Sequence, residues 1–111
     1  MNLYALKIDD LKFDKIIKKN ETQKKEFILT NNEVDEKIYR LTIENDKNVK
    51  VLPNIIQLKS YESKKIQIQV KGSEGKGDRN YYLVIKEIQK TKQNKININK
   101  SVKIKQTYKI K

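Results

Sequence analysis

The 111-residue chain contains no cysteine, no histidine and no tryptophan, and it has only three glycines and one proline. Without cysteine and histidine it has no thiol nucleophile, no disulfide, no imidazole base and no zinc site of the usual kind. Its four serines therefore lack the histidine that would activate them as nucleophiles. These absences predict a protein that is not an enzyme and that carries no metal ion and no cofactor.

Long hydrophobic runs are also missing from the sequence. No stretch approaches the ~18 apolar residues that a membrane helix needs, which predicts that the chain does not span a bilayer. A secretory signal peptide needs a charged start followed by about 7–15 apolar residues, and the start from Met1 to Lys7 is too short and too polar to be one.

The charge is strongly positive, because 26 Lys and Arg residues stand against 14 Asp and Glu residues and give a formal net charge of +12. Lysine supplies 24 of these cations, and the lysines are scattered with no run longer than two. This distribution favours a lysine-coated, solvated surface over a nucleic-acid footprint, which gathers its cations on one face. A nucleic-acid-binding domain stays open as an alternative, and it predicts an affinity that falls steeply with salt.

Apolar and polar residues alternate along most of the chain, which predicts strands rather than helices. About seven short strands in a chain of this length predict an all-β fold, an immunoglobulin-like antiparallel β-sandwich that forms a single domain over residues 1–111. The segment Asn80 to Ile88 is apolar on both faces, as expected of a central strand that is covered on both sides. The other expected strands are Leu3 to Ile8, Leu11 to Ile17, Lys24 to Asn31, Glu36 to Glu44, Lys64 to Val70 and 96 to 110.

The last of these segments has the longest alternation. The odd positions from 97 to 111 are all polar, whereas the even positions from 96 to 110 are apolar apart from Lys100 and Gln106. A terminal strand is often the edge of a sheet, and an apolar edge can pair with a strand of a partner or with a second copy of the chain in an edge-to-edge homodimer. The other interpretation is that the even positions pack into the core of the domain itself.

Four stretches resemble the N-terminal domain of the periplasmic pilus-assembly chaperones, the PapD-like family. The most specific of them is Asp78 to Ile88, which is similar to the family's segment that begins with Asp-Arg and ends with Glu-Ile. The other three are Phe27 to Asn32, Val51 to Lys59 and Val102 to Lys109. The resemblance implies an immunoglobulin-like sandwich whose last strand is lent to an incomplete pilus or surface-fibre subunit.

The resemblance also implies roles for particular residues. In the family, the last strand donates alternating apolar side chains, and two basic residues hold the C-terminal carboxylate of the subunit. One of the two is an arginine near the start of the family's chains, and Lys12 is its nearest match here. A lysine attracts a carboxylate as a point charge without the two-pronged hydrogen bonding of arginine, so Lys12 would be a weaker anchor than that arginine. Transferred motif by motif, the donated side chains are those of Ile96, Ile98, Val102 and Ile104, and the carboxylate anchors are Lys105 and Lys12.

The sequence thus predicts a non-enzymatic, chaperone-like domain of the periplasm that binds a pilus or fimbrial subunit by strand donation. The second sandwich domain of the family is expected to be absent, and Met1 is expected to take the place of a removed signal peptide. Two alternatives remain open, namely a structural or scaffolding immunoglobulin-like domain without chaperone activity and a basic nucleic-acid-binding domain.

Overall fold

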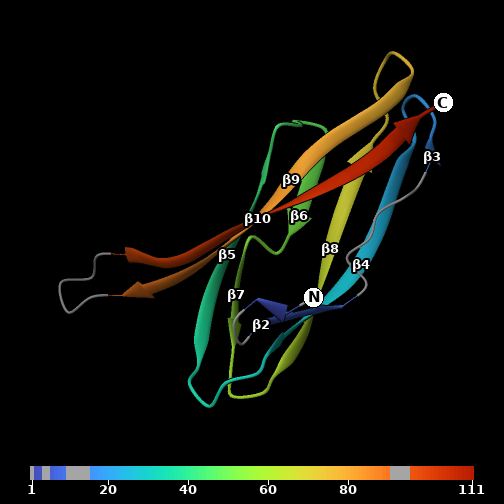
Figure 1. Ribbon diagram of the computed structural model, residues 1–111. Helices are drawn as coiled ribbons and strands as arrows, with labels where there is room; N and C mark the ends of the chain where they lie inside the picture. Colours follow the sequence, from blue (N-terminus) through green and yellow to red (C-terminus); the bar gives the residue numbers. More distant parts are fainter. Residues whose placement is uncertain (1, 4–5, 10–15, 91–95) are drawn as a thin grey trace.

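A computed structural model describes residues 2–3, 6–9, 16–90 and 96–111, together with the side chains of residues 6–9, 16–88 and 100–111. Every regular element in these ranges is a strand (Figure 1). The strands are β1 (Asn2–Leu3), β2 (Leu6–Asp9), β3 (Ile16–Ile17), β4 (Thr22–Asn31), β5 (Lys37–Glu44), β6 (Val49–Leu52), β7 (Ile55–Leu58), β8 (Ser63–Lys71), β9 (Gly77–Lys90) and β10 (Ile96–Ile110).

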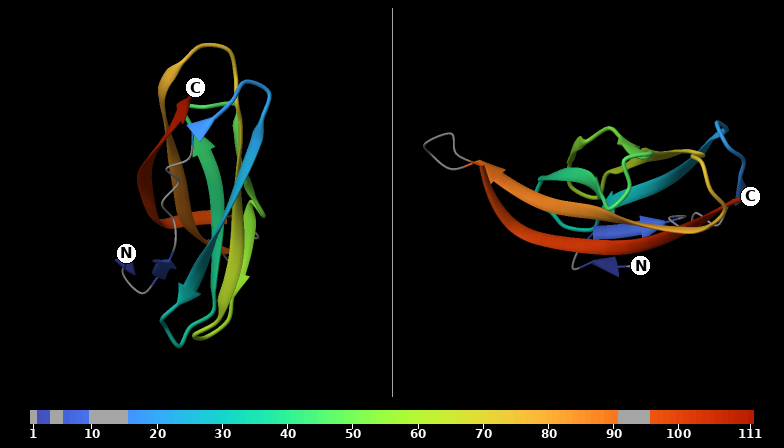
Figure 2. Two further views of the ribbon diagram at one scale, coloured as in Figure 1. Left: turned by 90° about the vertical axis from the view of Figure 1, so that its right-hand side faces the viewer. Right: turned by 90° about the horizontal axis from the view of Figure 1, so that it is seen from above.

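The strands form two five-stranded sheets that pack face to face (Figure 2). The first sheet has the order β1-β2-β4-β8-β6, and the second has the order β3-β10-β9-β5-β7. All pairs are antiparallel except β3 with β10, which run parallel. The predicted immunoglobulin-like β-sandwich is therefore confirmed, with one parallel pair that the alternation did not indicate.

The core lies between the sheets and is filled by the apolar rows that the sequence predicted. In the first sheet the inward residues include Phe27 and Leu29 of β4, with the even positions 66, 68 and 70 of β8. In the second sheet, Tyr39 and Leu41 of β5 pack with the odd positions 81, 83 and 85 of β9. Val84, on the opposite side of β9, is also fully buried, so both sides of this strand are covered at its centre.

The chain crosses from one sheet to the other between two strands of only four residues each. β6 ends the first sheet and β7 begins at the edge of the second, with Pro53 in a cis peptide bond after Leu52 between them. The backbone carbonyl of Asn54 in this crossover accepts a hydrogen bond of 2.7 Å from the amide of Leu41. Strands this short carry too few residues for an alternation to be recognised, so neither was predicted as a separate strand.

β9 and β10 form a long hairpin that extends beyond the body of the sandwich (Figures 1 and 2). Their antiparallel register runs from Ile96 opposite Lys90 to Ile110 opposite Gly77, whereas the neighbouring β5 pairs with β9 only as far as Ile88. The last part of the expected strand Leu11 to Ile17 is β3, and its residues 11–15 lie outside the described part of the chain.

Candidate functional site

β10 is the candidate site because one side of it is open. Its inner neighbour in the second sheet is β9, and on its other side β3 pairs only with Lys109 and Ile110. The amide of Lys111 continues this contact by donating to the carbonyl of Ile17 at 3.0 Å. Between 96 and 108, no strand of the described chain pairs with the side of β10 that faces away from β9; we call this side the open edge of β10.

The register of β10 changes near its beginning. Ile98 pairs with Ile88, but Lys100 pairs with Glu87, so one residue is inserted between the two positions. An insertion of this kind is a β-bulge, and it exchanges the rows of a strand because successive residues belong to opposite faces. The prediction of one unbroken row of even positions from 96 to 110 is therefore wrong at this bulge.

After the bulge the predicted alternation holds. Ile104, Tyr108 and Ile110 are buried in the core of the domain, and Val102 is half-buried against it. The odd positions from 101 to 109 are all exposed on the outer face of the second sheet. Two of the four predicted donated side chains, those of Val102 and Ile104, thus pack on the domain itself.

For the other two side chains that were predicted to be donated to a partner, the structure describes the backbone only. Ile96 and Ile98 belong to β10 ahead of the bulge, where they pair with Lys90 and Ile88 at the far end of the hairpin. Their side chains lie outside the described side chains.

The predicted carboxylate anchor Lys105 is exposed, opposite Tyr82 of β9. Among the described residues its ammonium group has no ion pair, unlike that of Lys103, whose Nζ lies 2.8 Å from Glu44 Oε2. The hydrogen bond to Glu44 raises the pKa of Lys103. The second predicted anchor, Lys12, lies outside the described residues, so its place relative to Lys105 stays a prediction.

The opposite edge of the same sheet is different. β7 pairs with β5, and the Nζ of Lys64 reaches across from the first sheet to donate a hydrogen bond of 2.7 Å to the backbone carbonyl of Gln57 in β7. A lysine that occupies a main-chain acceptor at a sheet edge hinders the addition of another strand there. The described structure therefore leaves β10 as the more accessible edge of the second sheet.

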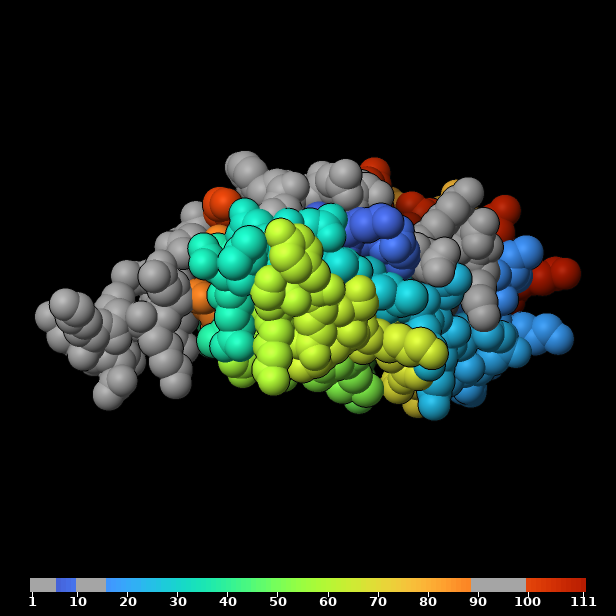
Figure 3. Space-filling model, turned by 90° about the horizontal axis from the view of Figure 1, so that it is seen from below, coloured from blue at the N-terminus to red at the C-terminus, as the bar shows by residue number. Residues whose placement is uncertain are grey.

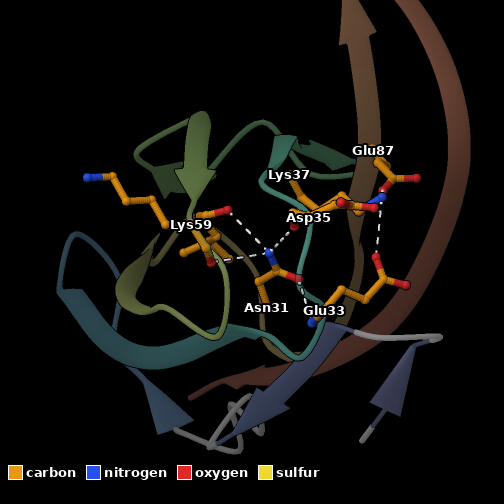
Figure 4. A network of polar contacts seen from close by, with 7 residues as sticks. Asn31, Glu33, Asp35, Lys37, Lys59 and Glu87 are labelled. Atoms are coloured by element: carbon orange, nitrogen blue, oxygen red, sulfur yellow. Dashed lines mark hydrogen bonds and ion pairs between the residues drawn. The ribbon is translucent and has the colours of Figure 1, made fainter.

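A buried asparagine organises the end of the sandwich where β5 begins (Figure 4). The side-chain amide of Asn31 donates to the carbonyls of Asp35, Leu58 and Lys59 at 2.8, 3.3 and 3.2 Å, and its oxygen accepts from the amide of Glu33 at 3.0 Å. These bonds hold the loops 32–36 and 59–62 side by side (Figure 3). The sequence does contain a signal for this role, since Asn31 stands at an inward position of the β4 alternation after Phe27 and Leu29.

An ion pair lies close to this network. Lys37 Nζ is 3.0 Å from Glu87 Oε1 and 3.3 Å from Glu33 Oε2, and Glu87 is only 7% exposed on the inner side of β9 (Figure 4). The hydrogen bond with Glu87 raises the pKa of Lys37 against the opposing effect of burial. Glu87 pairs with Lys100 directly after the bulge, so the ion pair neutralises a buried charge at the point where β10 changes register.

The other end of the sandwich holds an open polar pocket of about 380 Å³. Its polar groups are largely bonded to one another, because Asp46 accepts from the Tyr108 hydroxyl and from the amide of Asn48. The described residues contain no group of acidic, histidine or cysteine side chains that could hold a metal ion. No helix in the described part of the chain is long and apolar enough to cross a membrane.

No family model matches the sequence, and no curated protein matches it. Solved structures do share the fold. SSP-19 of Caenorhabditis elegans, an MSP-domain protein like family member, superposes with a TM-score of 0.64 at 11% identity, over 86% of this chain and 92% of that one. The ASH/PapD-like domain 7 of human CEP192 gives 0.64 at 13% identity, over 96% and 85% of the two chains.

The periplasmic chaperone SfaE is similar to the same extent, with a TM-score of 0.66 at 13% identity. The match covers 96% of this chain but 58% of the chaperone chain, so the present chain spans little more than half of that protein. At identities of this size the likeness shows the fold alone. The chain has the immunoglobulin-like fold of PapD-like and MSP domains, as its sequence predicted.

Proposed function

We propose that this domain is a protein-binding module that pairs the open edge of β10 with an extended segment of another protein, in the manner of a PapD-like periplasmic chaperone. The proposed partner is a pilus or surface-fibre subunit. The single observation that carries the proposal is the long outer strand β10, whose edge has no paired strand from 96 to 108 in the described structure.

The physical basis of the proposal is strand addition. A strand edge presents a row of main-chain donors and acceptors, and thirteen residues in extended conformation offer about 40 Å of it. A partner strand satisfies these groups, while pockets for alternate side chains provide the specificity. The chain shares its immunoglobulin-like fold with the periplasmic chaperone SfaE, and the resemblance of its sequence to PapD-like chaperones implies that the last strand is the one that pairs with a partner.

The two halves of β10 take different parts in this proposal. Val102 and Ile104 pack on the core and fix the strand to its own domain. Ile96 and Ile98, ahead of the bulge, are the side chains that we propose to be lent to the subunit. Lys105 is exposed beside the open edge, and we propose that it holds the terminal carboxylate of the subunit through a charge-assisted hydrogen bond, with Lys12 as the second cation.

A scaffolding domain without chaperone activity is the second candidate. The burial of Ile104 and the packing of Val102 against the core favour it, because these side chains serve the domain's own fold. Under this alternative the open edge of β10 has no strand-binding role.

The experiment is a selection from a displayed library of random twelve-residue peptides, with the purified domain as bait. Strand addition predicts enrichment of peptides that alternate apolar and polar residues, and loss of their binding in Ile96→Asp/Ile98→Asp. The matched control is Ile55→Asp at the β7 edge, where the isoleucine is 49% exposed. Strand addition at β10 would be refuted if no alternating peptides were enriched, or if Ile96→Asp/Ile98→Asp bound the selected peptides as tightly as Ile55→Asp does.

The carboxylate anchor is tested with one selected peptide in two forms. We expect the peptide with a free C-terminal carboxylate to bind more tightly than the amidated peptide, and Lys105→Ala to abolish the difference. If the two forms bind wild type equally, Lys105 does not hold a carboxylate, whatever the fate of strand addition.

A further inference from the structure

The outer face of β10 carries positive charge along the open edge. Ser101, Lys103, Lys105 and Thr107 are consecutive exposed positions of this face, and all of them belong to the part of β10 that β3 does not cover. The face therefore presents two lysines and no acidic residue over this stretch. Any strand added to the open edge must place its own side chains directly beside these two cations.

One of these two lysines is already paired with a carboxylate of the same sheet. The backbone of Lys103 pairs with Val84 of β9. Its side chain extends over β9 to the next strand, β5, where its Nζ lies 2.8 Å from Glu44 Oε2. Lys105 has no ion pair with a described residue, although it stands only two positions farther along the same face. The uncompensated charge thus lies on the side of the sheet where a partner would bind.

A second copy of the chain is disfavoured at this edge in antiparallel pairs centred on residues 103 to 105. In an antiparallel pair centred on residue 104, Lys103 of each copy lies opposite Lys105 of the other. Pairs centred on 103 or 105 set Lys103 or Lys105 opposite itself. Like charges directly across a strand pair are destabilising, and lysines on an edge are a common protection against self-association.

We infer that the partner strand carries aspartate or glutamate at the alternate positions that lie beside Lys103 and Lys105, with apolar residues at the positions between. The partner is an acidic-apolar segment of another protein and not a second copy of this chain. The inference rests on the proposed function, since it specifies the chemistry of the strand that the open edge of β10 accepts.

Three synthetic peptides of about eleven residues test the inference. They share the same alternating valines and isoleucines and differ in the residue between them, which is glutamate, serine or lysine. Their C-termini are amidated, so that no terminal carboxylate reaches Lys105. Two cross-strand ion pairs predict that the glutamate peptide binds about three- to ten-fold more tightly than the serine peptide at low salt, with the lysine peptide weakest.

Charge reversal provides the matched variants. Lys103→Glu/Lys105→Glu should invert the order, so that the lysine peptide binds best. Lys24→Glu/Lys50→Glu changes two exposed lysines on the outer face of the first sheet and should leave the order unchanged. At about 0.5 M salt the preference should shrink to less than about two-fold, because exposed charges are screened.

Self-association gives an independent readout without any peptide. Lys105→Glu sets a glutamate opposite Lys103 twice in the pair centred on 104, so we expect dimerisation to strengthen about ten-fold or more in analytical ultracentrifugation. The double reversal restores like charges and should stay monomeric at the same concentration. Lys50→Glu, with the same change in net charge, should also stay monomeric.

The outcomes separate the inference from the proposed function. Equal binding of the glutamate and serine peptides, with Lys105→Glu as monomeric as Lys50→Glu, would overturn the inference and leave strand addition standing. No binding by any peptide would count against strand addition itself, and the inference would fail with it.

Discussion

Asn31 offers the sharpest test of how the domain holds its loops. Its side chain is fully buried and makes polar contacts with four backbone groups, three of them carbonyls. The two amide hydrogens and the oxygen together make about three full hydrogen bonds, each contributing about 0.5–1.5 kcal/mol. We therefore expect Asn31→Ala to lower the free energy of unfolding by about 2–4 kcal/mol. In a domain of this size that corresponds to about 10–25 °C in Tm.

Asn31→Asp separates hydrogen bonding from shape. The carboxylate keeps the acceptor for the amide of Glu33 but points an oxygen at the carbonyls of Asp35, Leu58 and Lys59. Burial and these carbonyls raise the pKa of the introduced carboxyl above the ~3.9 of an unfolded aspartate. The folded state then binds the proton more tightly than the unfolded chain does. The variant therefore shows its full loss of unfolding free energy at pH values above the raised pKa. As the pH falls toward about 4, the variant should regain about 1.4 kcal/mol per pH unit.

Urea unfolding followed by far-UV circular dichroism at pH 7 and pH 4 measures both effects, since the chain has no tryptophan to report by fluorescence. Asn32→Ala, at the exposed neighbouring position, is the control and should stay within about 0.5 kcal/mol of wild type. The reasoning would be refuted if Asn31→Ala were as stable as this control, or if Asn31→Asp lost as much stability at pH 4 as at pH 7.

Three further predictions concern the ion pair, a glycine and a tyrosine. Lys37→Met leaves Glu87 buried without its cation and should cost about 3 kcal/mol at pH 7 in urea unfolding; a loss below about 1 kcal/mol would contradict this. Gly72→Ala places a Cβ 2.0 Å from a backbone carbonyl oxygen, so it should lower Tm far more than Gly77→Ala, whose Cβ meets nothing within 4 Å at a φ of +110°. Burial raises the pKa of Tyr39 to about 12, above the value of about 10 in the unfolded chain. The folded domain should therefore keep its full stability below pH 10 and lose free energy of unfolding as the pH rises from 10 toward 12, which urea unfolding at alkaline pH measures. Unchanged stability over that range would contradict it.

The sequence predicted those parts of the fold that depend on local alternation. β4, β5 and β8 each bury one row of side chains in the core between the two sheets, and a period of two in the sequence indicates this arrangement directly. β9 was predicted instead from apolar residues on both of its faces, and both faces are buried at its centre. The exposed odd positions from 101 to 109 were predicted for the same reason. The number of alternating segments predicted the β-sandwich, and the resemblance to PapD-like chaperones implied the same fold, which SfaE and the CEP192 domain share.

Features that depend on distant pairing were not predictable in this way. The alternation does not locate the bulge between Ile98 and Lys100, because the three residues from 99 to 101 are all polar and fit either face of the strand. The contact of Lys64 with Gln57 joins two different sheets, and nothing in the local pattern of either strand indicates it. The sequence thus predicted the last strand, β10, whereas its register and its open side required the structure.

Amide hydrogen exchange along β10, measured by NMR on the free domain, tests the central claim most directly. In an antiparallel pair, alternate residues direct their main-chain groups toward the neighbouring strand and away from it. An open edge from 100 to 108 predicts that every second amide is protected by β9 and that the amides between exchange rapidly. A bound strand should then protect both sets. Uniform protection of residues 100–108 in the free domain would contradict the account, because it would mean that the edge is already covered.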